Sequence, residues 1–67
     1  MPKKIRDLLK ELRNAGFELD RQKGSHRQFK HPNLAGVITL AGAESDDAKT
    51  YQERQIAEII AKSKPSN

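Results

Sequence analysis

The fold is decided by one stretch near the middle of the chain, Arg21-Gln22-Lys23-Gly24-Ser25-His26-Arg27-Gln28-Phe29-Lys30-His31-Pro32. Its central tripeptide, Lys23-Gly24-Ser25, predicts a tight turn, because glycine adopts positive φ without a steric penalty. Residues 26–31 alternate two sets of side chains, which is typical of a strand, and Pro32 ends that strand because proline has no backbone donor. The stretch therefore predicts a β-hairpin.

The alternation gives the second strand of this hairpin two different faces. Phe29 is its apolar residue, so the face of Phe29, which also carries Arg27 and His31, is expected to meet the core. We interpret His31 as structural for that reason. The opposite face is expected to lie in solvent, away from the helices, and to carry His26, Gln28 and Lys30.

The segment before the hairpin and the one after it complete the sheet and add a first helix. Apolar residues at helical spacing predict this helix from Lys3 to Ala15, with Gly16 as its left-handed cap. Residues 17–22 alternate as the first strand, and residues 37–40 predict a third. In the first strand, this alternation places Arg21 on the face of Phe17 and Leu19.

A second helix is predicted near the C-terminus. Thr50 and Glu53 fit a capping box, in which a hydroxyl and a carboxylate satisfy amides at a helix start. The apolar face of this helix is expected to contain Ala48, Tyr51, Ile56, Ile59 and Ile60. The predicted fold class is α+β with the order α-β-β-β-α, in which both helices cover one face of a three-stranded antiparallel sheet.

Length and composition exclude several classes of protein. A chain of 67 residues predicts one small domain over residues 1–62 with a frayed tail at 63–67, and it leaves no room for a deep enclosed pocket. Because it has no cysteine, a thiolate nucleophile, a disulfide and a Cys-based zinc site are excluded. No apolar run is long enough for a membrane span or a signal peptide, so we expect a cytoplasmic location.

Positive charge is concentrated in the first half of the chain. Residues 1–31 hold nine Lys and Arg against four Asp and Glu, a balance of 9 − 4 = +5, whereas the remainder sums to 4 − 5 = −1. The sequence pI is about 9.7. This distribution is typical of a protein that binds a polyanion, and nucleic acid is the polyanion that we expect.

The surroundings of His26 combine a proton-transfer group with cations. RNA carries its own nucleophile in the 2′-hydroxyl, so a protein needs only to align it with phosphorus, move protons and neutralise charge. An imidazole suits the proton transfer, because histidine titrates near neutral pH. His26 is therefore the candidate catalytic residue, and the candidate RNA-binding residues are Lys23, Gly24, Ser25, Arg27 and Lys30.

The residues alone leave several alternatives open. The same basic face suits a non-catalytic RNA-binding module, a surface that only receives an acidic protein partner, or a solvated histidine with no function. Gly24 and Ser25 also have a simpler role as turn residues. A zinc site formed by His26 and His31 is disfavoured, because further ligands are lacking and the two side chains lie on alternate faces.

Several segments form a recognisable pattern along the chain: Lys4-Ile5-Arg6-Asp7-Leu8-Leu9, Ala15-Gly16-Phe17, Lys23-Gly24-Ser25-His26-Arg27-Gln28-Phe29, His31-Pro32 and Val37-Ile38-Thr39. With this pattern the chain resembles the HicA toxins of bacterial HicA–HicB toxin–antitoxin systems over nearly its whole length. The start of the second helix, Asp46-Asp47-Ala48-Lys49-Thr50-Tyr51-Gln52, differs from the Gly-Thr-Leu-Arg type of start in many members.

The resemblance implies a fold like the double-stranded-RNA-binding domain and an activity as a translation-independent mRNA endoribonuclease. It also implies that His26 matches the catalytic histidine of the family. A HicB-type antitoxin is the implied protein partner, and it would form an inhibitory complex. We expect the activity to need no metal or other cofactor and the free chain to be a monomer.

Overall fold

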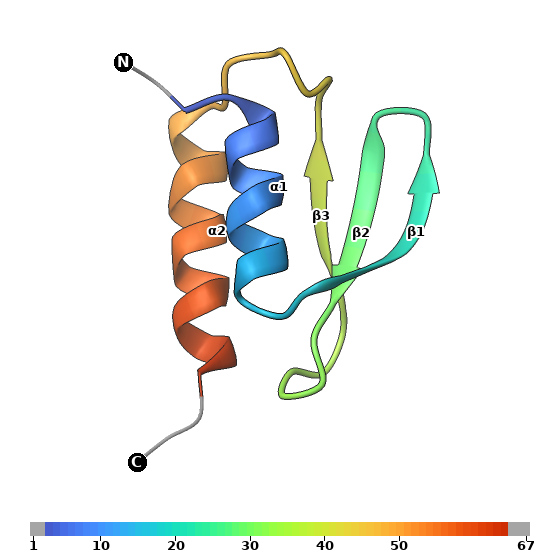
Figure 1. Ribbon diagram of the computed structural model, residues 1–67, viewed down its shortest axis with the longest axis vertical. Helices are drawn as coiled ribbons and strands as arrows, with labels where there is room; N and C mark the ends of the chain where they lie inside the picture. The colour runs from blue at the N-terminus through green and yellow to red at the C-terminus, as the bar shows by residue number, and fades with distance from the viewer. Residues whose placement is uncertain (1–2, 65–67) are drawn as a thin grey trace.

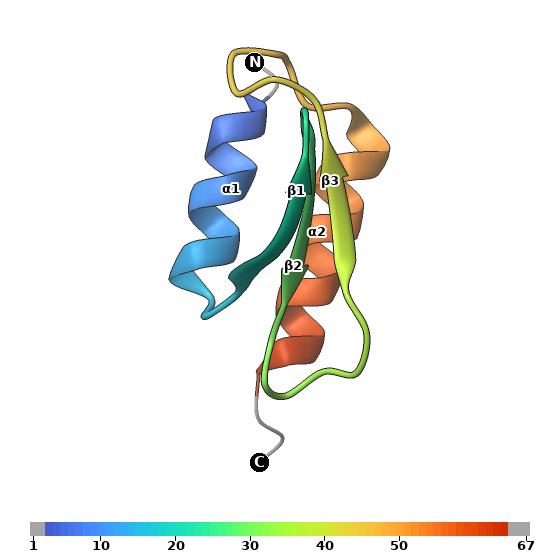
Figure 2. The same ribbon diagram turned by 90° about the vertical axis from the view of Figure 1, so that its right-hand side faces the viewer.

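A computed structural model of the chain describes residues 3–64. Its elements are α1 (Ile5–Asn14), β1 (Glu18–Lys23), β2 (His26–Lys30), β3 (Ile38–Ala41) and α2 (Thr50–Ser63). The strands form one antiparallel sheet in the order β1-β2-β3, and both helices lie on the same side of it (Figures 1 and 2). The predicted α+β class and element order are confirmed. Within residues 3–64 neither helix is long and apolar enough to cross a membrane.

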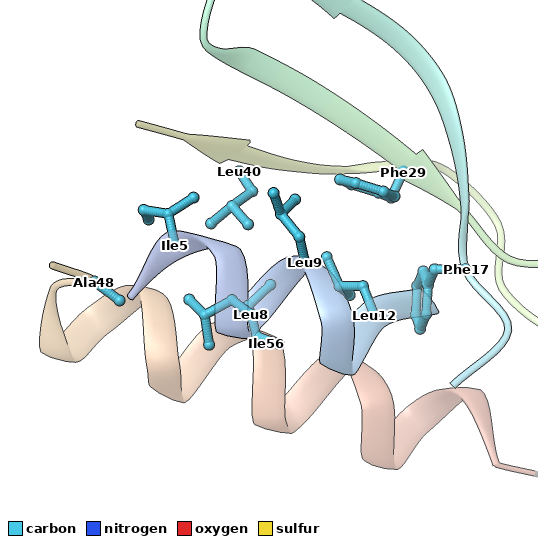
Figure 3. Close-up of a cluster of buried hydrophobic side chains, with 9 residues drawn as sticks. All are labelled: Ile5, Leu8, Leu9, Leu12, Phe17, Phe29, Leu40, Ala48 and Ile56. Carbon is cyan, nitrogen blue, oxygen red and sulfur yellow. The ribbon is translucent and has the colours of Figure 1, made fainter. Parts of the chain in front are cut away.

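The core lies between the helix layer and the inner face of the sheet. Leu9 of α1 points toward Leu40 and Phe29 on the sheet, whereas Leu8 points toward Ile56 of α2 (Figure 3). Full burial of a side chain of this size contributes about 1.5–3 kcal/mol to folding. The buried apolar set is Ile5, Leu8, Leu9, Leu12, Phe17, Phe29, Leu40, Ala48 and Ile56.

A β-bulge changes the alternation of β1. Leu19 pairs with Phe29 of β2, but the next pair is Arg21 with Gln28, so the register shifts between Leu19 and Arg21. The extra residue in a bulge reverses the side to which the following residues point. Arg21 therefore lies on the outer face of the sheet, opposite to the face that simple alternation predicts. The sequence prediction for Arg21 is corrected by this bulge.

The start of α2 differs from the predicted capping box. The helix begins at Thr50, so Lys49 is the N-cap residue, and its backbone N–H donates to Oε1 of Gln52 at 2.9 Å. Gln52 is buried, with 7% of its surface exposed, whereas Tyr51 is 56% exposed and does not join the apolar face. The prediction chose the wrong residues for the cap and for one position of the buried face.

The end of α2 lies beyond the predicted start of fraying. Ser63 is buried, its Oγ donates to the carbonyl of Ile60 at 2.7 Å, and its own carbonyl accepts from Nδ2 of Asn33 at 2.9 Å. These bonds satisfy polar groups that a helix end otherwise leaves without partners. Residues 65–67 of the predicted tail lie outside the described residues.

Candidate functional site

The turn between β1 and β2 sets His26 directly opposite Lys23. Gly24 and Ser25 form a two-residue connection in which Gly24 has φ +59° and Ser25 has a negative φ. A glycine at the first position followed by negative φ is the pattern of a type II′ hairpin turn, whose twist matches that of the strands. Lys23 and His26 are therefore register partners, and their side chains share the outer face.

A shallow hollow on the outer face surrounds His26. Its volume is ≈ 250 Å³, and it is open to solvent. Strand pairing explains its composition, because Gln28 is the register partner of Arg21 on one side and of Thr39 on the other. The five lining residues are Arg21, Lys23, His26, Gln28 and Thr39.

The hollow has a cationic character. Arg21 and Lys23 approach His26 from β1, and no acidic side chain belongs to the lining. His26 is exposed, so a polyanion can reach the imidazole without any rearrangement of the backbone. An exposed imidazole beside two cations can transfer a proton while the cations hold a phosphate.

Lys30 lies on the same outer face but at the other end of β2. Lys30 is four positions along the chain from His26, which corresponds to about 13 Å along a strand. Its Nζ is 3.7 Å from Oδ1 of Asp20, and both side chains are exposed, so this ion pair contributes little to stability. Lys30 is therefore placed to contact a phosphate other than the one beside His26.

Arg27 lies on the inner face, away from the hollow. Its Nη1 donates to the carbonyl of Gly42 at 3.1 Å, and its Nη2 is 3.8 Å from Oε2 of Glu44. Only 14% of the Arg27 side chain is exposed. The structure thus does not bring Arg27 together with His26, and the guanidinium instead holds the connection between β3 and α2.

Gly24 and Ser25 lie at the tip of the hairpin beside the hollow. The Gly24 carbonyl accepts from Nε2 of Gln22 at 3.1 Å, and the Ser25 carbonyl accepts from the Gly42 N–H at 3.2 Å. A Cβ atom built on Gly24 meets nothing within 4 Å. The turn therefore requires glycine at position 24 because of its φ angle and not because of crowding.

His31 has a different environment from His26. It is 8% exposed, and its ring centroid lies 4.7 Å from that of Phe17. Its Nδ1 accepts from the Asn33 N–H at 3.0 Å, so Nε2 carries the proton and donates to the Ala15 carbonyl at 3.0 Å. These contacts fit a structural role, in which His31 ties the end of β2 to the end of α1.

The described residues contain no group of three or more His, Cys, Asp and Glu side chains that could hold a metal ion. His26 is exposed at the start of β2, the central strand, whereas His31 is buried just beyond the end of β2. A zinc site shared by these two side chains does not fit this arrangement.

Comparison with known proteins assigns the chain to a family. Residues 5–61 match the family described as the HicA toxin of bacterial toxin–antitoxin systems, which covers most of the 67-residue chain. The chain belongs to the HicA toxin family. This match confirms the resemblance seen in the sequence and identifies the chain as a toxin-type component that acts with an antitoxin. No curated protein and no solved structure was found to match.

Three residues that line the hollow were not among the site residues predicted from the sequence: Arg21, Gln28 and Thr39. The alternation of β2 places Gln28 on the same face as His26, but its side chain is uncharged, so the charge pattern did not mark it as a site residue. Arg21 was hidden by the bulge, which no composition pattern marks. Thr39 enters through the pairing of β3 with β2, and single-sequence patterns do not give strand register.

Proposed function

We propose that this HicA family member is an endoribonuclease that cleaves mRNA at the outer face of its sheet, with His26 as the proton-transfer residue. The observation that supports this proposal best is the register pair of Lys23 and His26, which sets a cation beside an exposed imidazole. The family match supports the class of toxin. The shallow, open hollow suits a flexible single strand better than a small metabolite, which binds in a deeper cavity.

In the proposed reaction the 2′-hydroxyl of one nucleotide attacks the adjacent phosphorus. The bond from O2′ to phosphorus forms, and the bond from phosphorus to O5′ of the next nucleotide breaks. A neutral His26 accepts the 2′-hydroxyl proton while water protonates the leaving O5′, or a protonated His26 protonates O5′ while water accepts the 2′-hydroxyl proton. The products are a 2′,3′-cyclic phosphate and a free 5′-hydroxyl, and no metal ion or other cofactor takes part.

The cations of the outer face are proposed to bind different phosphates, according to their distance from His26. Lys23 and Arg21 lie beside His26, so they are proposed to stabilise the charge that develops on the reacting phosphate. Lys30 is proposed to hold a phosphate further along the strand. Gly24 and Ser25 are proposed to offer backbone N–H groups at the tip of the hairpin, since neither N–H donates a hydrogen bond within residues 3–64.

Control of this activity is proposed to come from a HicB-type antitoxin. The hollow is open to solvent, so a second protein that covers His26 would keep RNA away from it. Acidic groups on that protein would associate rapidly with the basic face. Because the proposed substrate is mRNA, we propose that the activity is cytoplasmic, and we propose that the free toxin is a monomer.

A non-catalytic RNA-binding module is the second candidate, because the same exposed cations support it. The two functions are separated by incubating the purified chain with an mRNA transcript and analysing the ends of any fragments. Fragments with 2′,3′-cyclic phosphate and 5′-hydroxyl ends would support the proposed reaction. Intact RNA retained in a complex would support the binding module and contradict the nuclease.

A further inference from the structure

The two free edges of the sheet differ in how they resist pairing with other chains. β1 forms one edge, where its bulge and the charged side chains Glu18, Asp20, Arg21 and Lys23 oppose the addition of another strand. β3 forms the other edge with the uncharged sequence Ile38-Thr39-Leu40-Ala41, which contains no proline. Within residues 3–64, the β3 edge thus has none of the sequence features that protect β1.

Backbone groups along β3 point away from the sheet and toward α2. In an antiparallel pair, alternate residues direct both N–H and C=O to the partner strand. The Ala41 carbonyl accepts from Nε2 of Gln52 at 2.9 Å, so the backbone of Ala41 faces away from β2. Alternation then gives Thr39 and Val37 the same outward direction. Within residues 3–64, no hydrogen bond joins another residue to the outward groups of Thr39.

A groove accompanies this edge. It lies between β3 and α2, which occupy the same side of the molecule in Figure 2, and its volume is ≈ 410 Å³. Val37 is 52% exposed at this groove and is one of three exposed large apolar side chains in the described chain, with Leu19 and Tyr51. Ile59 is half-buried on the helix side. A groove between a free strand edge and a helix is the geometry in which an extended peptide adds a strand.

We propose that the antitoxin inserts an extended segment into this groove and pairs it with β3 as a fourth strand. The segment would bond to the Thr39 N–H and C=O, the Ala41 N–H and the Val37 C=O. On the α2 side the groove is lined by Ile59 together with Gln55, Glu58 and Lys62. The segment would therefore place one apolar side chain between Val37 and Ile59 and polar side chains opposite Glu58 and Lys62. The Ala41 carbonyl already accepts a hydrogen bond from Gln52, so the paired segment would end at Ala41, near the start of α2.

The place of β3 beside the hollow favours the antitoxin over other occupants. Thr39 is the register partner of Gln28, and Ala41 is that of His26. A strand added to β3 would lie two strand spacings, or about 10 Å, from the strand that carries His26. A protein anchored at the β3 edge can therefore extend directly over His26. This inference rests on the proposed function, because it assumes that the partner acts by covering that site.

Two matched variants test the docking of the antitoxin. Val37→Lys and Leu19→Lys each replace an exposed apolar side chain with a cation, the first at the β3 groove and the second on β1, where Leu19 is 48% exposed. The probe is the purified antitoxin encoded beside this chain, and its dissociation constant is measured for both variants. We expect Val37→Lys to weaken binding by about tenfold or more and Leu19→Lys by less than about twofold. Equal effects of the two variants would overturn the inference.

Amide hydrogen exchange reports the strand pairing directly. Binding of the antitoxin should slow exchange of the Thr39 N–H, which points outward from β3. The control is the Gln22 N–H on β1, which also points outward because the neighbouring Lys23 closes the turn with His26. Its exchange should stay fast unless the antitoxin pairs with β1. Unchanged exchange at Thr39 in a saturated complex would overturn strand addition.

Cleavage by the free variants separates this inference from the proposed function. Val37 lies outside the hollow around His26, so free Val37→Lys should cleave RNA at the wild-type rate and require more antitoxin for inhibition. If the wild-type chain cleaves no RNA, the proposed function fails, yet the binding and exchange measurements still decide whether β3 is the docking edge. If Val37→Lys cleaves normally and is inhibited as the wild type is, only the docking inference fails.

Discussion

Lys23 and His26 are register partners across a two-residue turn, so an ammonium group and an imidazole share the outer face at the tip of the hairpin. Neither residue is held there by burial. The position of both follows from Gly24, whose φ of +59° allows the tight connection. The chemistry of the site thus depends on a local backbone feature more than on the core.

Replacement of Gly24 tests this dependence. Gly24→Ala should lower the free energy of unfolding by about 1–2 kcal/mol, because a Cβ atom disfavours the left-handed region. Gly24→Asn should cost less, since asparagine tolerates positive φ better than alanine. Urea unfolding followed by circular dichroism measures both values. Equal stability of the alanine variant and the wild type would contradict the role of the turn.

The two arginines near the hairpin should respond differently to truncation. Arg21→Ala should weaken binding to a non-cleavable single-stranded RNA and make the slope of log affinity against log salt shallower by about 0.7. Arg27→Ala should leave that slope nearly unchanged and lower stability instead, because it removes the bond to the Gly42 carbonyl. Titrations at several salt concentrations, with urea unfolding of the same samples, measure both effects. A shallower slope for Arg27→Ala alone would reverse this assignment.

Truncation of the second histidine should affect the fold. His31→Ala removes the partner of the Asn33 N–H and of the Ala15 carbonyl and leaves a space beside Phe17. We expect a loss of about 1–3 kcal/mol in the free energy of unfolding, measured by urea unfolding. Below the unfolding transition, the folded fraction should retain its RNA cleavage. Full stability combined with lost cleavage would make His31 part of the active site.

Antitoxin and RNA should compete for the outer face. A non-cleavable RNA bound to the chain should be released when the antitoxin is added, because both require access to His26. Fluorescence anisotropy of a labelled RNA measures this displacement. Labelled RNA that stays bound when the antitoxin saturates the chain would contradict inhibition by occupancy.

The element order could be predicted because it follows from local periodicity. The apolar spacing of α1, the left-handed cap at Gly16 and the alternation around Phe29 each depend on neighbouring residues only. The face that carries His26 followed from the same alternation. These features needed no knowledge of which segments pair.

The remaining features depend on contacts between distant segments. The bulge that turns Arg21 outward arises from the pairing of β1 with β2. The Gln52 side chain makes two hydrogen bonds, one that caps the start of α2 at Lys49 and one to the Ala41 carbonyl of β3. The alternation placed Arg27 on the inner face, but its bond to Gly42 became visible only in three dimensions. Tertiary contacts of this kind override local propensity and are absent from a single sequence.

The central claim is that His26 performs proton transfer, and the most direct test is the cleavage rate of a folded His26→Ala variant. His26 is exposed and makes no core contact, so the variant should unfold at the same urea concentration as the wild type. Its affinity for a non-cleavable RNA should change little, because Arg21 and Lys23 remain. The single-turnover cleavage rate should fall by about 10²- to 10⁴-fold. A folded His26→Ala protein that cleaves RNA at the wild-type rate would contradict the claim.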